Sequence, residues 1–600
     1  MKLHSLKING FRRIESAEIN FGEATFLIGA NNCGKSTVFK AIEWLLSAKK
    51  QIPSQEYFSI VDDETGETKP AVQTIVLEAE FRNLPVDAVN WRGFKGRIFS
   101  YAPKDAEDSG LSVTYRKTFP LGSDVVVEFK SKERFMSPKF EGAKTGNDFI
   151  LKGVPEADVI EVFPILGDKI GASKAALEKL EQLDFIWETR ENETWFQNPG
   201  GIPGNVLKML PRFLIIPADA AASEIEGGAS GVLGKTLGEL FEDVRGMSQN
   251  YAQAQIFLDK LATELDPEDG LSEFGKMIAE LNGVLAGVFP DSKLHAKASL
   301  NDPKTALRPT FTVEMSSNVR TPVTHQGTGM VRAAAFGMLR FRQRWLSKRE
   351  DDHTRSLIVC FEEPEIYLHP SAASQMRNTI YELSGGASQI IATTHSPYII
   401  DLSRKPRQIL NSLKIEDGRV VAKAFNVTDE YIALEADDKS HVKMLLRVDD
   451  YVSRVFFTKN VVIVDGDTEE VLIKESIKRL EKEKLLRIVS DFEIVKARGK
   501  ASIIGLVKYL VALRIFPIVV HDRDQGTPGA EKFNLPIANA VGQNGRVVQM
   551  HENVEDVLGY KAASEKPFRA YQETLKWGET WDQVSPAWQV KMKEIFGAYV

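Results

Sequence analysis

Hydrophobic and polar residues alternate in the first part of the chain as they do in β-strands. Residues 3–8 and 17–21 place apolar side chains at about every second position, and Asn9-Gly10 between them predicts a hairpin turn. The continuous apolar run at 24–28 predicts a buried strand, and the apolar residues within 37–46 recur at helical spacing. The chain is therefore expected to open with a hairpin, a buried strand and a helix.

The pattern changes further along the chain. From about residue 155 to 300 the spacing of apolar residues predicts helices, most clearly at 252–265 and 272–288. A second α/β stretch is expected to follow, and a new α/β unit to open at residue 460. Pro406 and the turn at 415–419 indicate the approach to a domain boundary. The other predicted strands lie at 74–81, 125–129, 309–315, 357–361 and 389–393.

Composition and charge are those of an ordinary globular protein. The 600 residues are 43% hydrophobic and 26% charged, and no apolar run approaches the ~20 residues that span a membrane. The N-terminus lacks the apolar core of an export signal, and both cysteines lie inside candidate nucleotide-site motifs, so a reducing cytoplasm is expected. The net charge of −7 does not indicate a nucleic-acid partner. A local basic groove or metal-bridged phosphate contacts would nevertheless suffice for one.

Residues 29–36 form a complete phosphate-binding loop, Gly-Ala-Asn-Asn-Cys-Gly-Lys-Ser, between the predicted strand and helix. Gly29 and Gly34 allow backbone N–H groups to close around phosphates at a helix N-terminus. Lys35 is expected to reach the β- and γ-phosphates, and Ser36 to hold Mg²⁺. The sequence therefore predicts a site for a nucleoside triphosphate.

Two later strands end in side chains that suit an ATPase. The apolar run 357–361 is followed by Glu362 and Glu363, and the run at 390–394 is followed by His395. One carboxylate at such a strand end can help to hold Mg²⁺, and the next can polarise the attacking water. Many strands also end in a charged turn with no such role, so the acidic pair alone leaves both interpretations open.

Together these motifs resemble the ATP-binding-cassette (ABC) ATPases of the RecF and SMC type. The resemblance rests on Asn9-Gly10-Phe11-Arg12, the phosphate loop, the Glu-Glu-Pro-Glu run with its later Leu-His-Pro, and Thr-His-Ser-Pro. It implies that Glu362 is the metal-side acid, Glu363 the catalytic glutamate and His395 the switch histidine near the γ-phosphate. The residues that it implies in nucleotide binding around the loop are Arg12, Gly29, Asn32, Gly34, Lys35, Ser36 and Thr37.

The same resemblance implies a signature motif and a dimer. Residues 326–332, with Gly327 and Gly329, open a predicted helix where such ATPases carry the segment that caps the nucleotide of an opposing subunit. A head-to-head homo-oligomer is therefore expected. The segment departs from the Leu-Ser-Gly-Gly-Gln that is usual in such ATPases. The helical stretch 155–300 is interpreted as a dimerisation insert, with a plain structural subdomain as the alternative.

Four carboxylates lie near the ends of two predicted strands in the C-terminal part. Asp465 follows the run 461–464 with Glu469 one helical turn later, and Asp522 and Asp524 follow the run 516–520. Ligand sites collect at the carboxyl ends of parallel strands, and hard cations such as Mg²⁺ or Mn²⁺ prefer oxygen ligands. The pattern leaves open whether these residues form a metal site or solvated turns, and whether Asp524 points towards a shared ion or away from it.

Strand-Asp-Gly-x-Thr-Glu followed by Asp-x-Asp resembles the Toprim domain of topoisomerases, primases and certain nucleases. An ABC-type ATPase followed by Toprim is the layout of the OLD (overcoming lysogenization defect) endonucleases, several of which act in anti-phage defence, including Gabija and retron-associated systems. The resemblance implies that Asp465, Glu469, Asp522 and Asp524 bind metal. It adds Glu555 as a second-metal ligand and Lys566 as a catalytic lysine, with an ordinary surface lysine as the alternative. Asp465 stands where the family usually has glutamate.

The predicted fold is α/β: an ABC-type P-loop ATPase with a helical insert, followed by a Toprim domain. The expected function is that of an ATP-binding, divalent-metal-dependent DNA endonuclease using Mg²⁺ (or Mn²⁺ or Ca²⁺), gated by its ATPase and acting in antiviral defence. A partner protein or a reverse transcriptase complex is a possible associate. The alternatives are an ATP-driven DNA-binding scaffold with a silent Toprim domain, which Asp465 favours, and a Toprim nuclease that acts on RNA. The predicted domain limits are 1–154 and 301–427 for the ATPase halves, 155–300 for the insert, 428–458 for the linker and 459–600 for Toprim.

Overall fold

The computed structural model describes most of the chain outside residues 220–354, where it describes 231–247, 327–346 and a few short pieces. Outside that region the residues left undescribed are 62–67, 92, 95, 104–107, 172–175, 177, 178, 182, 199–205, 367, 387, 449, 562 and 563. The chain divides into two compact units, Met1–Ala218 with Arg355–Val600, and Asp219–Thr354. Each unit is described by itself below.

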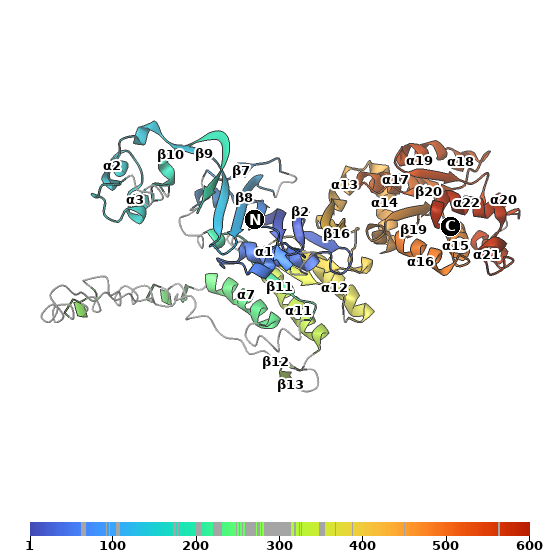
Figure 1. Ribbon diagram of the computed structural model, residues 1–600, viewed down its shortest axis with the longest axis horizontal. Coiled ribbons are helices and arrows are strands. Elements are labelled where there is room, and N and C mark those ends of the chain that lie inside the picture. Colours follow the sequence, from blue (N-terminus) through green and yellow to red (C-terminus); the bar gives the residue numbers. More distant parts are fainter. Residues whose placement is uncertain are drawn as a thin grey trace. The chain divides into compact units, whose positions relative to one another are not determined.

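An antiparallel sheet forms the first layer of the larger unit. Its strand order is β10-β9-β8-β6-β1-β2, with β7 pairing to β8 (Figure 1). In β6 every second residue is buried, because one face of the sheet packs on the core. The strands are β1 (Lys2–Phe11), β2 (Ile14–Asn20), β6 (Thr74–Arg82), β7 (Phe99–Ser100), β8 (Leu111–Pro120), β9 (Val126–Met136) and β10 (Trp187–Gln197).

The predicted hairpin turn at Asn9-Gly10 is wrong by about two residues. Both residues lie within β1, and Phe11 pairs with Ile14, so that Arg12 and the following arginine make the turn. At this turn Arg12 adopts a left-handed backbone conformation, with a φ of 51°. Gly10 itself has a φ of 73° and approaches the neighbouring β6 closely, which is why a glycine occurs inside the strand.

A second, mainly parallel sheet carries the phosphate loop. Its order is β11-β14-β15-β3-β16-β17, and only the β16–β17 pair is antiparallel. The strands are β3 (Ala24–Ile28), β11 (Arg212–Ile216), β14 (Leu357–Glu362), β15 (Ser388–Thr394), β16 (Gln408–Glu416) and β17 (Arg419–Phe425). All residues of β3 and β15 are buried, as expected of central parallel strands. The turn expected at 415–419 joins β16 to β17.

The helix α1 (Lys35–Leu46) follows the phosphate loop and joins the two sheets. Its apolar residues Val38, Phe39, Ile42 and Leu45 are fully buried in one core with residues from both sheets. Lys117 of β8 is also buried and donates hydrogen bonds to the carbonyls of Trp44 and Ser47, where α1 ends. The lysine thus satisfies carbonyls that a helix end leaves without partners.

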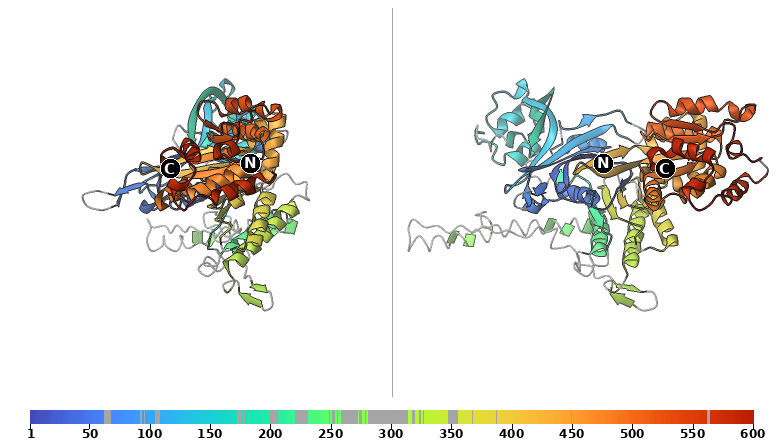
Figure 2. Two further views of the ribbon diagram at one scale, coloured as in Figure 1. Left: turned by 90° about the vertical axis from the view of Figure 1, so that its right-hand side faces the viewer. Right: turned by 45° about the vertical axis from the view of Figure 1, so that its right-hand side comes forward.

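The stretch expected to be a helical insert contains strands. Strand β10 extends the antiparallel sheet and β11 forms an edge of the parallel sheet, so the expected helical character of 155–300 is wrong for residues 187–197 and 212–216. Between β9 and β10 lies a small cluster with its own core, which includes α2 (Gly146–Leu151) and α3 (Glu156–Val162). Figure 2 shows it in cyan at the end of the β9–β10 hairpin. The helices expected at 252–265 and 272–288 lie largely outside the described residues.

The smaller unit, as far as it is described, contains two helices and a short hairpin. Helix α7 (Val232–Met247) packs on α11 (Thr328–Leu346), and β12 (Glu314–Ser316) pairs with β13 (Arg320–Pro322). Strand β12 overlaps the end of the strand expected at 309–315. Gly327 and Gly329 lie at the start of α11, so the predicted opening of a helix at this motif is confirmed.

The C-terminal part of the larger unit is a parallel sheet of order β19-β18-β20-β21 between helices, drawn in orange to red (Figure 2). Helix α14, which was predicted to be linker, packs on α17 and ion-pairs through Asp438 with Lys508 at 2.7 Å. It is therefore part of this fold. The elements are α13 (Val427–Ala433), α14 (Ala436–Val448), β18 (Asn460–Val464), α15 (Asp467–Ile477), α16 (Lys482–Asp491), β19 (Phe492–Lys496), α17 (Lys500–Ala512), β20 (Ile518–His521), α18 (Pro528–Glu531), α19 (Asn534–Val541), β21 (Arg546–Gln549), α20 (Val554–Leu558), α21 (Lys566–Thr574) and α22 (Pro586–Phe596).

Candidate active sites

The phosphate loop between β3 and α1 depends on glycine geometry. Gly29 and Gly34 have φ values of 146° and 101°, which other residues rarely adopt. A Cβ on Gly29 would also lie 2.2 Å from the carbonyl oxygen of Leu413 in the neighbouring β16. Asn32 takes a φ of 69° inside the loop. The motif therefore has the backbone that a phosphate cradle requires.

Lys35, His395 and Glu363 form a chain of contacts at this loop. The ammonium of Lys35 donates to the carbonyls of Gly29 and Ala30 at 2.9 Å and lies 2.8 Å from Nε2 of His395. The same Nε2 is 3.3 Å from a carboxylate oxygen of Glu363. Burial, together with the charge of Lys35, lowers the pKa of His395. A neutral histidine suits this position because its ring nitrogen can accept from the lysine.

The backbone of Glu363 is held in an unusual conformation just beyond the end of β14. Its φ is 42°, and its N–H donates to both the carbonyl and the hydroxyl of Thr393 at 3.1 Å. Strained residues of this kind persist where the surroundings fix them, and they collect at functional sites. Glu365 lies behind it and accepts from the hydroxyl of Thr394 at 2.5 Å and from the N–H of His395. Burial raises the pKa of Glu365.

Lys35 and Glu363 line a pocket of about 440 Å³, whereas His395 and Glu365 are not among its lining residues. The expected nucleotide residues that line it are Arg12, Asn32, Gly34, Lys35, Ser36, Thr37, Glu362 and Glu363. Arg12 is held there by an ion pair with Glu56. Thr393 lines the pocket and orients Glu363, a role that the sequence pattern did not single out. The expected signature residues, Gly327 and Gly329, belong to the other unit, and their contact with nucleotide stays a prediction.

A second pocket, of about 310 Å³, lies at the carboxyl edge of the C-terminal sheet. Five of the residues expected from the sequence line it together: Asp465, Glu469, Asp522, Glu555 and Lys566. Asp465 follows β18 and Asp522 follows β20, and these strands are parallel neighbours, so their ends meet. Glu469 is buried in the first turn of α15 and accepts a hydrogen bond from the N–H of Gly466. The topology thus gathers residues that are up to a hundred positions apart.

Asp524 is directed to another partner. Its carboxylate forms a 2.8 Å ion pair with Lys500, whose side chain is only 4% exposed, and it is not among the residues that line the pocket. Lys500 begins α17 and also donates to the side chain of Asn534 at 3.0 Å. In this structure Asp522 therefore lines the pocket, while Asp524 pairs with a buried lysine, and metal binding by Asp524 stays a prediction.

The pocket carboxylates repel one another. Burial, followed by the charges of Glu469, Asp524 and Glu555, raises the pKa of Asp522 to about 8. Burial is also the main reason why the pKa of Glu469 rises to about 6 and that of Asp465 rises above its ordinary value. One buried carboxylate oxygen of Asp465 and one of Asp522 have no hydrogen-bond partner among the described residues. Such a site favours an added positive charge, from protons or from a cation.

The charge and the oxygen chemistry of this pocket fit a hard divalent cation. In the part of the chain that the structure describes, however, no three acidic, histidine or cysteine side chains stand close enough to form a ready-made ligand set. Lys566 lies 3.3 Å from Glu555. Burial alone would lower its pKa, but Glu555, Asp522 and Asp524 raise the pKa overall. The lysine therefore holds its charge at the edge of the acidic pocket.

Comparison with known proteins finds the two kinds of domain that the sequence predicted. Residues 1–400 match the family model described as AAA ATPase domain, and residues 456–524 match the one described as overcoming lysogenization defect protein-like, TOPRIM domain. The chain belongs to the AAA ATPase domain family, and its C-terminal part carries an OLD-like TOPRIM domain. It is an enzyme that combines an ATPase with a Toprim endonuclease domain, as the sequence resemblance predicted.

Three curated relatives have nuclease names. The Old nuclease of Escherichia phage P2 is 21% identical over 95% of this chain and 86% of its own length. The OLD nuclease of Thermus scotoductus is 27% identical over 59% of this chain and 69% of its own. The endonuclease GajA of Bacillus cereus is 28% identical over 30% of this chain and 28% of its own.

Among solved structures, the SMC head domain from Thermotoga maritima matches at 11% identity and a TM-score of 0.27, over 70% of this chain and 98% of that one. The Smc head bound to the C-terminal winged-helix domain of ScpA matches at 14% identity and a TM-score of 0.35, over 72% of this chain and 99% of that one. No helix among the described residues is long and apolar enough to cross a membrane.

Sequence reasoning missed two basic residues beside the Toprim pocket. Lys500 pairs with Asp524, and Arg498 lines the pocket itself. Both lie where β19 ends and α17 begins. The signal available in the sequence was the run Arg498-Gly499-Lys500 directly after a short apolar strand, which places a glycine and cations at a third strand end of the same sheet.

Proposed function

We propose that this chain is a divalent-metal-dependent DNA endonuclease whose ATPase gates cleavage, and that it acts in defence against phage. The observation that carries the proposal is the pocket at the carboxyl edge of the Toprim sheet, where Asp465, Glu469, Asp522 and Glu555 meet Lys566. The nuclease names of the relatives support phosphodiester cleavage, and the name of the GajA endonuclease supports the internal mode of attack.

The acidic and basic residues of the Toprim site have different proposed roles. Asp465, Glu469, Asp522 and Glu555 would hold divalent cations. Bound there, such cations supply an activated water and stabilise the leaving oxygen. Lys566 holds a positive charge at the edge of the pocket, where it can stabilise negative charge on the phosphate. Lys500 neutralises Asp524, which limits the repulsion among the carboxylates.

The ATPase site supports the gating part of the proposal. Lys35, Ser36 and Thr37 would bind the phosphates of ATP with Mg²⁺, and Glu362 would complete the metal site. Glu363 would act on the attacking water, because its carboxylate lies at the pocket and its backbone is fixed by Thr393. His395 would report the γ-phosphate through its contact with Lys35. A head-to-head dimer through the helix that starts at Thr328 is part of the same proposal.

The test is nicking of supercoiled plasmid by the full chain with Mg²⁺ or Mn²⁺, with and without ATP. We expect cleavage that is lost in Asp522→Ala and altered in its ATP response in Lys35→Ala. Lys593 is exposed on α22 and lines neither pocket. Lys593→Ala is therefore the matched control and should cleave as the wild type does. Cleavage that survives in Asp522→Ala, or ATP hydrolysis without cleavage of DNA by any metal form, would contradict the proposal. Cleavage of RNA but not of DNA would instead support a Toprim nuclease that acts on RNA.

A further inference from the structure

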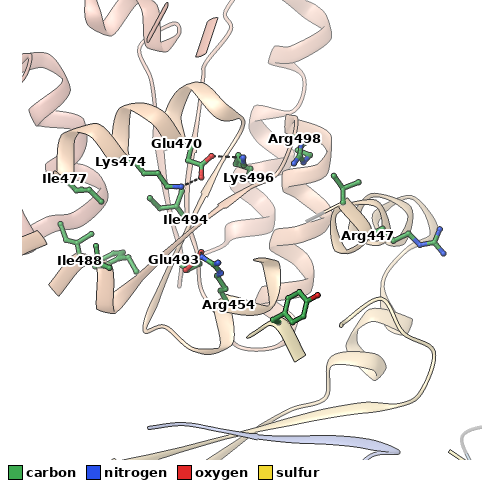
Figure 3. Close-up of a pocket in the computed structure, with 14 residues that line it drawn as sticks. Arg447, Arg454, Glu470, Lys474, Ile477, Ile488, Glu493, Ile494, Lys496 and Arg498 are labelled. Atoms are coloured by element: carbon green, nitrogen blue, oxygen red, sulfur yellow. Dashed lines mark hydrogen bonds and ion pairs between the residues drawn. The ribbon is translucent and has the colours of Figure 1, made fainter. Parts of the chain in front are cut away.

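A groove of about 730 Å³ lies mainly on the C-terminal part of the larger unit, and Figure 3 shows the residues that line it. It runs along β19, the edge strand of the sheet, and is bordered by the end of α14 and by residues of α15 and α16. Arg498 lines both this groove and the Toprim pocket. The two cavities therefore share a lining residue, and a ligand lying in the groove would be close to the Toprim pocket at Arg498.

The groove is basic although the chain as a whole is acidic. It is lined by five cationic side chains, those of Arg447, Arg454, Lys474, Lys496 and Arg498, and by only two acidic ones. Glu470 is shared between Lys474 at 2.6 Å and Lys496 at 3.0 Å, as the dashed lines in Figure 3 show, and Lys496 also pairs with Asp467 and Arg454 with Glu493. Arg447 and Arg498 have no ion-pair partner among the described residues, so they supply most of the positive charge that is left for a ligand. Positive charge concentrated in this way on a protein of net charge −7 indicates a polyanionic ligand.

The groove also has apolar walls. Ile477, Ile488 and Val489 lie on its side formed by α15 and α16, and Phe492 and Ile494 come from β19. Val489 and Val448, which also lines the groove, are 61% and 57% exposed, whereas Ile477, Ile488 and Phe492 are at most 8% exposed. The apolar surface that the groove offers to a ligand therefore comes mainly from the two valines. Duplex DNA presents phosphates and groove edges to a surface of this kind and keeps the faces of its bases stacked inside. An unpaired strand, in contrast, presents both phosphates for the cations and base faces for the apolar side chains.

Arg498 has the features of a ligand-binding residue. Its φ is 58°, an uncommon value for a residue with a side chain, and Gly499 follows with a φ of 119°. The N–H of Gly499 donates to the carbonyl of Asp465 at 3.2 Å, which ties this turn to the Toprim carboxylates. The Arg498 side chain is exposed and has no hydrogen-bond or ion-pair partner among the described residues. A strained backbone thus presents an available guanidinium between two cavities.

We propose that this groove binds an unpaired DNA strand and that Arg498 contacts a phosphate next to the scissile one. Arg447 and Lys474 contact phosphates further along the same strand, and the apolar wall receives its bases. The Toprim domain then cleaves a strand that has been separated from its complement, or one that is already single. This inference rests on the proposed nuclease function, and it adds to it the strand form of the substrate and the residue that positions it.

The test measures binding by fluorescence anisotropy, with the full chain, EDTA and a labelled single-stranded DNA of about twenty nucleotides. Removal of one phosphate contact should weaken binding on any sequence and lower the salt dependence by about one counterion. We therefore expect Arg498→Ala to weaken binding about tenfold, and Arg498→Lys to keep most of the affinity and the salt slope. The unlabelled duplex of the same sequence should compete poorly. Lys593→Ala is again the matched control and should bind as the wild type does.

The variants separate this inference from the proposed function. If Arg498→Ala binds single strands as the wild type does, with an unchanged salt slope, the groove assignment is wrong, even if plasmid cleavage requires Asp522. If the duplex competes as well as the single strand, the unpaired-strand assignment is wrong. If Asp522→Ala still cleaves, the failure lies in the proposed nuclease site, and the binding result in EDTA is judged on its own.

Discussion

Replacing Asp522 by asparagine should stabilise the metal-free protein, and the gain should grow with pH. In the folded chain the pKa of Asp522 is raised to about 8 by burial and by neighbouring carboxylates, whereas an unfolded aspartate has a pKa of about 3.9. A raised pKa means that the protonated form favours folding. That contribution is fully present below about pH 4 and is lost as the pH rises towards 8. Asparagine stays neutral and avoids the loss.

The magnitude follows from the two pKa values. Each pH unit above the unfolded pKa costs about 1.4 kcal/mol of unfolding free energy until the folded pKa is reached, so Asp522 costs about 1–2 kcal/mol at pH 5 and about 4 kcal/mol at pH 7. For a domain of about 150–250 residues, 1 kcal/mol moves the unfolding midpoint by about 2–4 °C. The midpoint of Asp522→Asn in EDTA should then exceed that of the wild type by about 2–8 °C at pH 5 and about 8–16 °C at pH 7.

The assay is thermal unfolding of both proteins in EDTA at pH 5, 7 and 9, followed by circular dichroism. Asp582→Asn, which removes an exposed carboxylate from the same unit, is the control and should give a flat, near-zero offset. Added Mg²⁺ should raise the midpoint of the wild type more than that of Asp522→Asn, because bound cation relieves the repulsion. An offset equal at pH 5 and pH 9, or a variant less stable than the wild type throughout, would refute the reasoning.

Three further predictions concern the ATPase part. Glu363→Gln should bind ATP normally but hydrolyse it about 10²–10⁴ times more slowly, as measured by phosphate release, if its carboxylate acts on the water. Gly29→Ala should abolish ATP binding in a filter assay, because its Cβ would meet the Leu413 carbonyl at 2.2 Å, whereas Gly337→Ala, where nothing lies within 4 Å, should bind ATP normally. Burial lowers the pKa of Lys117 to about 7, so wild-type stability should fall from pH 10 to pH 7. Lys117→Met should therefore gain stability relative to the wild type over that range in urea unfolding, and parallel profiles would contradict the assignment.

The sites predicted best from sequence are those whose geometry is local. The phosphate loop is fixed by glycines within eight residues, so its strand, loop and helix were all predicted. The Toprim carboxylates were predicted as a group because parallel strand ends meet at one edge. The direction of Asp524 was not predictable, because alternation along a strand end does not reveal a partner. That partner, Lys500, comes from the start of another helix.

The errors in the fold have a similar cause. Strand β10 was missed because its partner β9 lies some fifty residues earlier, across a small helical cluster, and the helical spacing of that cluster dominates the surrounding pattern. The hairpin turn was placed at Asn9-Gly10 because this pair favours turns. In the structure Gly10 is used for a close approach to β6 instead, and pairing continues to Phe11. Non-local strand pairing overrode the local preference in both cases.

The position of β3 in its sheet has a consequence for biosynthesis. β3 lies between β15 and β16, strands that begin 360 or more residues after β3 ends. At ribosomal rates of about 5–20 residues per second, the phosphate loop is made roughly 20–70 s before the strands that flank it. A nascent chain therefore has no complete nucleotide site until the ATPase half of the polypeptide is nearly finished, and the Toprim segment is synthesised directly afterwards. Because all strands of the nucleotide-binding sheet precede the Toprim sheet in the chain, the ATPase sheet can be complete before the Toprim domain has been synthesised.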